Sequence, residues 1–203
     1  MNDIIVNKDL VSPSKVVCIG RNYVEHIKEL NNEMPTQPVI FVKPNSAICS
    51  EIISGTDEAI HYEGEISFVI EDGKISAVGF GLDLTKRTVQ SQLKSKGLPW
   101  ERAKAFDKSA VFSEFVRFSG NIEDLSLQLV INGKLSQQAD FALMIYKPLQ
   151  LIEEVAGFMS FADGDILMTG TPKGVGELSK NDCFVGRIFA GDTLLIEQKW
   201  IVK

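Results

Sequence analysis

Residues 60–84 read IHYEGEISFVIEDGKISAVGFGLDL, and their pattern predicts two largely apolar strands joined by a turn. Residues 60–70 alternate well enough to form one strand, and residues 71–74 (Glu-Asp-Gly-Lys) are typical of a turn. The apolar residues 79–84 form a strand that leads into a helix expected over residues 85–96, which is followed by glycine and proline. This stretch therefore indicates a β-rich protein in which helices are inserted between strands.

The rest of the 203-residue chain follows the same pattern. Further strands are expected at residues 16–19, 39–42, 125–131, 166–169 and 193–198, a hairpin turn at Asn132-Gly133, and short helices at residues 23–30 and 148–159. Since no repeat or long linker divides the chain, we expect a single domain over residues 1–203, with residues 1–13 as an N-terminal lead-in. The elements predict an α+β fold whose sheets are mixed or antiparallel, rather than a regular βαβ array.

Composition and charge exclude several classes of function. A net charge of −6 and a pI near 5.0 argue against a dedicated nucleic-acid binder, whose affinity comes mainly from cations that meet phosphates. No apolar run approaches the roughly 20 residues that span a bilayer, so no membrane partner is expected. The scattered cysteines Cys18, Cys49 and Cys183 form no CxxC pair and fit a reducing compartment, which makes the cytoplasm the expected location.

Three acidic residues are candidates for a metal site. Glu63 and Glu65 share one face of the expected strand, about 7 Å apart, among apolar neighbours that suggest burial. Asp83 adds a third carboxylate where a strand passes into a helix. Spacing alone favours a solvated strand face for the glutamates and a helix cap for Asp83. If the three converge instead, a site of oxygen ligands suits Mg²⁺ or Mn²⁺ better than zinc.

Basic residues and a glycine-rich loop could receive an anionic substrate. Arg21, Lys43, Lys104 and Lys173 lie at turns or strand ends, although a solvated surface is the ordinary place for any one of them. Glycines in the loop of residues 169–176 would let backbone N–H groups approach a small carboxylate, but the loop could equally be an ordinary turn.

His26 and Glu29 lie at positions i and i+3 of the helix expected at residues 23–30 and so share a face. A glutamate that orients an imidazole makes it a better general base, and histidine commonly activates water near neutral pH. Spacing alone favours the alternative, which is a surface ion pair on a short helix.

Several stretches of the chain, in the same order, resemble the fumarylacetoacetate hydrolase family, and most closely its short, single-domain acylpyruvate hydrolase members. The stretches are residues 18–26 (CIGRNYVEH), 41–44 (FVKP), 61–65 (HYEGE), 81–85 (GLDLT), 97–100 (GLPW) with Lys104, and 169–176 (TGTPKGVG). None of them would suffice by itself, whereas their common order makes a chance match improbable.

This resemblance implies a mixed β-roll or sandwich like the family's C-terminal domain, with a few short helices, and a homodimer. It implies Mg²⁺ or Mn²⁺ held by Glu63, Glu65 and Asp83. His26 and Glu29 would form a water-activating dyad on a lid segment, about residues 22–36, that orders when substrate binds. The remaining expected site residues are the active-site lysine Lys104 and the substrate contacts Arg21, Gln90 and Thr171, with Lys43 as a further candidate.

The reaction expected first is metal-dependent hydrolysis of a C–C bond in a small 2,4-dioxo acid of the acylpyruvate or fumarylpyruvate type, through a metal-bound pyruvate enolate. His26 would activate water, and Lys104 would stabilise the oxyanion. The first alternative is decarboxylation of oxaloacetate, or tautomerisation of oxaloacetate or a 2-hydroxymuconate, in the same site. The second alternative is a non-catalytic binder of 2-oxo acids. The dyad favours hydrolysis, because decarboxylation needs no attacking water.

Overall fold

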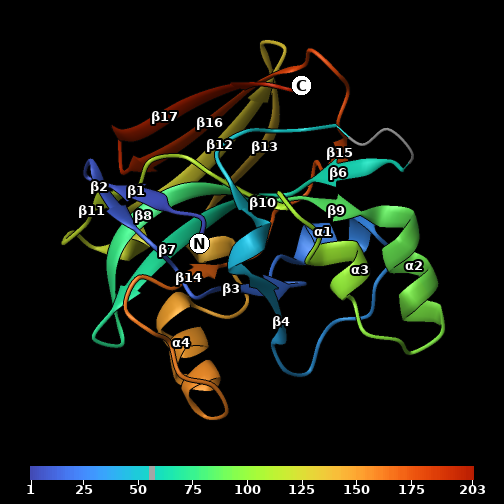
Figure 1. Ribbon diagram of the computed structural model, residues 1–203, viewed down its shortest axis with the longest axis horizontal. Coiled ribbons are helices and arrows are strands. Elements are labelled where there is room, and N and C mark those ends of the chain that lie inside the picture. Colours follow the sequence, from blue (N-terminus) through green and yellow to red (C-terminus); the bar gives the residue numbers. More distant parts are fainter. Residues whose placement is uncertain (55–57) are drawn as a thin grey trace.

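The computed structural model describes residues 1–54 and 58–203 and is mostly β, with only short helices (Figure 1). A mixed eight-stranded sheet forms its body, with the strand order β4-β3-β14-β7-β8-β10-β5 and with β11 paired to β8. Its strands are β3 (Lys15–Gly20), β4 (Val39–Pro44), β5 (Ile48–Cys49), β7 (Gly64–Glu71), β8 (Lys74–Asp83), β10 (Ala110–Phe112), β11 (Val116–Arg117) and β14 (Ile166–Met168). The expected β-rich α+β class with mixed sheets is confirmed.

A second sheet of four antiparallel strands has the order β13-β12-β16-β17. Strands β12 (Leu125–Ile131) and β13 (Lys134–Asp140) are joined at the expected Asn132-Gly133 turn, where both residues have positive φ. Strands β16 (Cys183–Ala190) and β17 (Thr193–Ile201) complete this sheet, which lies beside the curled body of the molecule (Figure 1).

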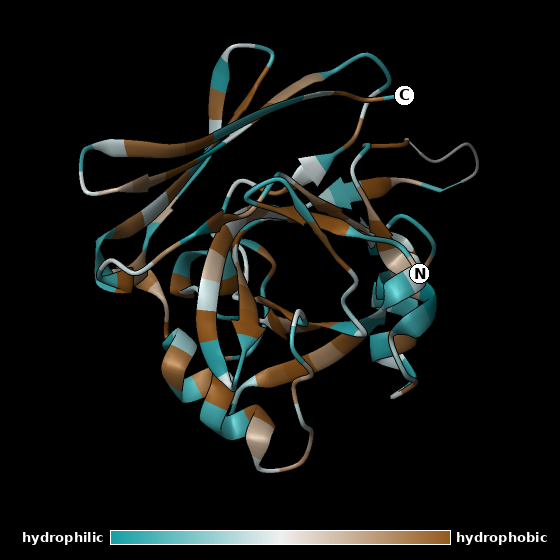
Figure 2. Ribbon diagram, turned by 60° about the vertical axis from the view of Figure 1, so that its left-hand side comes forward, coloured by the Kyte–Doolittle hydropathy of each residue, from teal (hydrophilic) through white to brown (hydrophobic). Residues whose placement is uncertain are grey.

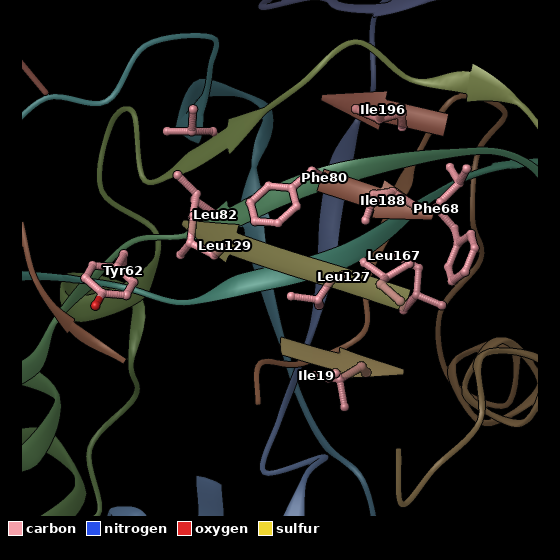
Figure 3. Close-up of a cluster of buried hydrophobic side chains, with 14 of the residues drawn as sticks. Ile19, Tyr62, Phe68, Phe80, Leu82, Leu127, Leu129, Leu167, Ile188 and Ile196 are labelled. Carbon is pink, nitrogen blue, oxygen red and sulfur yellow. The ribbon is translucent and has the colours of Figure 1, made fainter. Parts of the chain in front are cut away.

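A large apolar cluster lies between the two sheets, and a second one includes Ile4 and Val6 of the N-terminal segment. Figure 3 shows Phe80 of β8 next to Leu129 of β12, with Ile188 of β16 and Ile196 of β17 nearby. Figure 2 shows many apolar residues on the strands and polar ones at the turns, while the helices carry both kinds. Burying such side chains is the main favourable term in folding, at roughly 25 cal/mol per Å² of apolar surface, so this packing holds the two sheets together.

Smaller elements surround the sheets. A three-stranded sheet has the order β15-β6-β9, and residues 1–13, expected as a lead-in, contain a hairpin whose Ile4 and Val6 are buried. These strands are β15 (Gly176–Glu177), β6 (Ile60–Tyr62), β9 (Thr85–Lys86), β1 (Ile4–Val6) and β2 (Asp9–Val11). The helices are α1 (Val24–Glu29), α2 (Arg87–Ser95), α3 (Glu101–Lys104) and α4 (Pro148–Ala156), with 3₁₀ turns at Asn45–Ala47, Ile122–Asp124 and Phe141–Leu143. In the described ranges, no helix is long and apolar enough to cross a membrane.

The strand expected over residues 60–70 is broken at Glu63. Strand β6 ends at Tyr62 and pairs with β9 and β15, whereas β7 begins at Gly64 and pairs with β8 and β14. Space is tight at the break, because a Cβ atom on Gly64 would lie 3.0 Å from both Gln137 and Phe80. The chain therefore passes from one sheet to another at a candidate metal ligand.

Candidate active site

The three candidate metal ligands converge in the interior. Glu63, Glu65 and Asp83 each offer a carboxylate oxygen, and these oxygens all lie within 4.8 Å of one another. All three residues are at most 5% exposed. Pairing of β7 with β8 brings Glu65 close to Asp83, and the Asp83 N–H donates to the Glu63 carbonyl at 2.9 Å. The solvated strand face that spacing alone favoured is therefore wrong. Asp83 does not cap α2 either, because the N-cap position is Lys86.

Basic side chains compensate two of the three carboxylates. Lys104 Nζ lies 2.8 Å from Glu63 Oε2 and 2.6 Å from Asp83 Oδ2. Arg87 forms a second ion pair with Glu63, and Lys43 Nζ lies 2.8 Å from Asp83 Oδ1. Burial by itself would raise the pKa of Glu63, but the charges of Lys104 and Arg87 outweigh burial and lower it. Burial opposes the charge of Lys104, yet Asp83 and Glu63 raise its pKa.

Glu65 has no such compensation. Its Oε2 accepts the Gly170 N–H at 2.7 Å, and no ion pair to Glu65 is found among residues 1–54 and 58–203. Burial, together with the charges of Asp83 and Glu63, raises its pKa well above the usual range. A buried carboxyl with hard oxygen donors beside it and no basic partner is the environment that a divalent cation satisfies. The residues present therefore fit Mg²⁺ or Mn²⁺ held by Glu63, Glu65 and Asp83.

A small pocket opens next to this cluster. Its lining includes six of the residues expected from the sequence, namely Arg21, His26, Glu63, Gln90, Lys104 and Thr171. Helix α2 contributes Arg87, Gln90 and Lys94, which lie at positions i, i+3 and i+7 and so share one face. Gln90 Oε1 accepts from Arg87 at 2.8 Å, which leaves its amide N–H groups to donate.

Two cations of the lining have no acidic partner. In the described part of the chain, neither Arg21 nor Lys94 takes part in an ion pair, and Lys94 Nζ donates to Asn32 Oδ1 at 2.7 Å. Burial, followed by the charges of Arg21 and Arg87, lowers the pKa of Lys94. Arg21 adopts a positive φ of 57°, which is uncommon for a residue with a side chain. Together they give this side of the cavity positive charge that an anionic ligand would neutralise.

The His26–Glu29 pair is formed and is tied to the glycine-rich loop. His26 Nδ1 lies 3.1 Å from Glu29 Oε2, and Glu29 Oε1 accepts the Gly174 N–H at 2.9 Å. His26 is 5% exposed whereas Glu29 is exposed, so the pair differs from the surface ion pair that spacing alone favoured only in that its imidazole is buried. The same loop donates the Gly170 N–H to Glu65, and both glycines have a positive φ near 95°. One loop thus contacts both the dyad and the acidic cluster.

Lys43 lies behind the acidic cluster and is not among the residues that line this cavity. It is fully buried, and its Nζ donates to the carbonyls of Leu84 (3.3 Å) and Ser109 (3.0 Å) and to that of Lys104. This arrangement leaves Lys43 occupied by protein groups.

Two residues of the site were not expected from the sequence. Arg87 and Lys94 could have been found from the i, i+3, i+7 polar stripe that they form with Gln90 on a helix following Asp83. The stripe is weak as a signal, because solvated faces of helices show the same spacing.

Comparison with known proteins identifies the family of the chain. The model for the fumarylacetoacetate (FAA) hydrolase C-terminal domain matches residues 15–201. The chain belongs to this family. It is 40% identical over 187 residues to oxaloacetate tautomerase YcgM of Escherichia coli (strain K12), covering 83% of this chain and 85% of that protein. It is 35% identical over 210 residues to the mitochondrial oxaloacetate tautomerase of Schizosaccharomyces pombe, and the match covers 93% of this chain and 95% of that protein. The resemblance expected from the sequence motifs is confirmed.

Solved structures of the family share the fold. A putative fumarylacetoacetate isomerase/hydrolase from Oleispira antarctica superposes with a TM-score of 0.94 at 36% identity, over 100% of both chains. The fumarylpyruvate hydrolase from Pseudomonas aeruginosa, in complex with Mn²⁺ and pyruvate, superposes with a TM-score of 0.90 at 25% identity, over 99% of this chain and 95% of that one. The likeness to family enzymes and the acidic cluster together support an enzyme with a divalent metal.

Proposed function

We propose that this protein catalyses the keto–enol tautomerisation of oxaloacetate, or of a closely similar 2-oxo dicarboxylic acid, with the aid of Mg²⁺ or Mn²⁺. The observation that carries the proposal is one cavity whose lining includes Glu63 of the acidic cluster, His26, and the cations Arg21 and Lys94, which form no ion pair within the described residues. The names of the relatives at 35–40% identity support the same reaction.

The charge of the site favours a substrate with two carboxylates. The formal charges of Lys43, Lys104 and Arg87 equal those of the three carboxylates in number, although Glu65 itself has no basic partner in the described part of the chain. A bound dication would add two positive charges and Arg21 and Lys94 add one each, so a dianion offsets twice as much of this excess as a monoanion does. Oxaloacetate is a dianion, whereas an acylpyruvate with an apolar acyl group has one carboxylate. We therefore assign the second carboxylate to Arg21 and Lys94.

His26 is the proton carrier of the proposed reaction. When bound, the metal ion would supply Lewis-acid polarisation of the 2-oxo oxygen and its neighbouring carboxylate. With Nδ1 facing Glu29, His26 Nε2 takes the proton from the enol hydroxyl and delivers a proton to carbon 3, so that the enol becomes the ketone. The Gln90 amide can donate to the negatively charged substrate oxygen between these two transfers, whereas the Lys104 ammonium, whose three N–H groups bind Glu63, Asp83 and Thr85, contributes its charge alone.

A second candidate is hydrolysis of a C–C bond in a dicarboxylic acylpyruvate of the fumarylpyruvate type, which the sequence alone places first. The formed His26–Glu29 pair is compatible with hydrolysis as well, because a water-activating base has the same structure as a proton carrier. Residues 22–36 would then serve as a lid over the cavity.

We also propose that the protein is a homodimer and that it is located in the cytoplasm.

The experiment compares three reactions in one preparation of the protein with Mn²⁺. Tautomerisation is followed by the loss of the ultraviolet absorbance of the oxaloacetate enol, decarboxylation by pyruvate formation from oxaloacetate, and hydrolysis by pyruvate release from fumarylpyruvate. We expect tautomerisation to be fastest and to fall about 100-fold or more in His26→Ala. In Glu29→Gln it should fall as well, whereas the matched variant Glu25→Gln, in an exposed residue of the same helix, should retain the rate.

Enol decay no faster than with Mn²⁺ alone would overturn the proposal. Faster pyruvate release from fumarylpyruvate would put hydrolysis first.

A further inference from the structure

Gln137 of β13 reaches from the four-stranded sheet to the break between β6 and β7. It is 1% exposed, and each polar group of its side chain has a partner. Its Oε1 accepts the Gly64 N–H at 2.9 Å, and its Nε2 donates to Thr171 Oγ1 at 2.9 Å and to the Pro172 carbonyl at 2.8 Å. One amide therefore binds both the segment between two candidate metal ligands and the glycine-rich loop.

Thr171 closes this arrangement into a ring. Its hydroxyl accepts from Gln137 and donates to the Gly64 carbonyl at 2.9 Å, so both polar groups of the Gly64 backbone are bound. Gly64 stands between Glu63 and Glu65, and its conformation sets the directions in which the two carboxylates leave the chain. Without Gln137 the buried Gly64 N–H would have no partner, which would cost about 1–3 kcal/mol and favour a different backbone path.

The same face of the four-stranded sheet is otherwise apolar. Leu129, which lies opposite Gln137 in the β12–β13 pairing, is fully buried, as is Ile188. A leucine at position 137 would suit this face better, since a buried amide is costly unless it is fully hydrogen-bonded. Here every partner of Gln137 belongs to the segments that carry the site, which points to a role there and not in the core.

We propose that Gln137 is a positioning residue that sets the affinity of the acidic cluster for a divalent cation. It acts through Gly64, which orients Glu63 and Glu65, and through Thr171 and Pro172, which fix the loop whose Gly170 N–H binds Glu65. Gln137 is not among the residues lining the cavity, so it does not touch the substrate. The inference rests on the metal site of the proposed function and adds a residue from a different sheet.

The test measures binding of Mn²⁺ to the metal-free protein by calorimetry in Gln137→Met and in the matched control Gln138→Met. Methionine keeps the length of the side chain but removes its hydrogen bonds, and Gln138 is the exposed neighbour that points to the opposite face of β13. We expect Gln137→Met to raise the Kd for Mn²⁺ at least about 10-fold, as is usual when residues that orient metal ligands are lost. Gln138→Met should stay within about twofold of the wild type.

A folded Gln137→Met protein with an unchanged Kd for Mn²⁺ would overturn the inference. If Gln137→Met does not fold, Thr171→Val tests the inference instead, because it removes the hydroxyl group of the hydrogen-bonded ring but keeps the shape of the side chain. The inference predicts a raised Kd for Mn²⁺ in Thr171→Val, and an unchanged Kd refutes it. Wild-type protein that binds Mn²⁺ but does not accelerate enol decay would remove the proposed reaction and leave this inference standing.

Discussion

Among the three residues of the acidic cluster, Glu65 has the least favourable charge environment. Its neighbour Glu63 has two basic partners, but Glu65 has a single backbone N–H donor and two carboxylates nearby. Because the pKa of Glu65 is raised in the folded state, ionisation of this carboxyl opposes folding. The stability that protonated Glu65 allows is fully present at acid pH and is lost as pH rises through the raised value. In metal-free protein at neutral pH, this carboxyl is therefore a source of instability.

Substitution of the two glutamates should consequently have opposite effects on the metal-free protein. Glu65→Gln should leave stability at neutral pH unchanged or raise it by about 1 kcal/mol, because it removes an unpaired buried carboxyl. Glu63→Gln should lower stability by about 3–5 kcal/mol, because it breaks two buried ion pairs. Urea unfolding in the presence of a chelator measures the stability of both variants relative to the wild type. A loss of stability in Glu65→Gln comparable to that in Glu63→Gln would contradict this account of the charges.

Lys94 should make substrate binding sensitive to pH. Its lowered pKa means that the ammonium loses its proton at a lower pH than an ordinary lysine, and a dianionic substrate loses a partner at that point. The KM for oxaloacetate should therefore rise from neutral to alkaline pH. Lys94→Met should raise KM about 10-fold at neutral pH and remove the alkaline rise, whereas Lys94→Arg should preserve a low KM to higher pH. An identical pH profile of KM in Lys94→Met would exclude this role.

The chemical identity of the ligands could be predicted from the sequence, but their burial could not. Carboxylates at positions 63, 65 and 83 suggest an oxygen site, yet alternation in a strand is equally typical of a solvated face. Whether the two glutamates are buried or solvated depends on the backbone at Gly64, whose N–H binds Gln137, a residue of another sheet 73 residues away in sequence. No local pattern contains that contact.

At the scale of elements, the glycine-rich loop between β14 and β15 joins the two halves of the site. Gly170 binds Glu65 and Gly174 binds Glu29, each through its backbone N–H. Gly174 has a φ of 98°, and a Cβ atom there would lie 2.1 Å from the Ser136 carbonyl oxygen of β13. The loop can therefore hold Glu29 only with glycine at this position.

Gly174→Ala should displace the loop and lower kcat at least about 10-fold, since Glu29 then loses its N–H donor and His26 its orientation. The matched control is Gly73→Ala, in the β7–β8 turn, where φ is also positive but a Cβ atom would meet no other atom within 4 Å. It should cost about 1 kcal/mol of stability and leave kcat unchanged. Steady-state kinetics and thermal unfolding of the two variants compare the effects. Equal kcat values in both variants would show that the loop does not position the dyad.

Elements with a strong local pattern were predicted within a few residues. Helix α2 was expected from residue 85 but begins at Arg87, because residues 85–86 pair with β6 as strand β9. Strand β16, residues 183–190, was not expected, since glycine and arginine interrupt its apolar pattern. Gly186 is required there by packing, because a Cβ atom would lie 2.5 Å from the Phe80 ring.

For the whole molecule, Asp165 joins the beginning of β3 to the beginning of β14, strands 150 residues apart in sequence. Its carboxylate accepts the N–H groups of Ser14 (2.8 Å), Lys15 (3.0 Å) and Ala162 (2.8 Å), and it forms an ion pair with Lys15. Burial opposes its charge, but these donors outweigh burial and lower its pKa. The stabilisation is therefore complete above the pKa of an unfolded aspartate and is lost as pH falls through the lowered value.

Asp165→Asn should lower the free energy of unfolding by about 2–4 kcal/mol at neutral pH, and the difference from the wild type should shrink in acid. Asp192→Asn, in the exposed β16–β17 turn, serves as the control and should change stability by less than about 0.5 kcal/mol. Denaturant unfolding at a series of pH values measures these differences. If the difference in unfolding free energy between Asp165→Asn and the wild type stayed constant down to strongly acid pH, the stabilising role of the ionised Asp165 carboxylate would be contradicted.

The central claim is that the fold brings Glu63, Glu65 and Asp83 together around a divalent cation. Titration of metal-free protein with Mn²⁺ measures the binding of such a cation directly. Calorimetry should detect one ion bound per chain, with the affinity reduced about 100-fold or more in Glu65→Gln while the variant remains folded. Absence of binding in the wild type, or equal affinity in Glu65→Gln, would contradict the central claim.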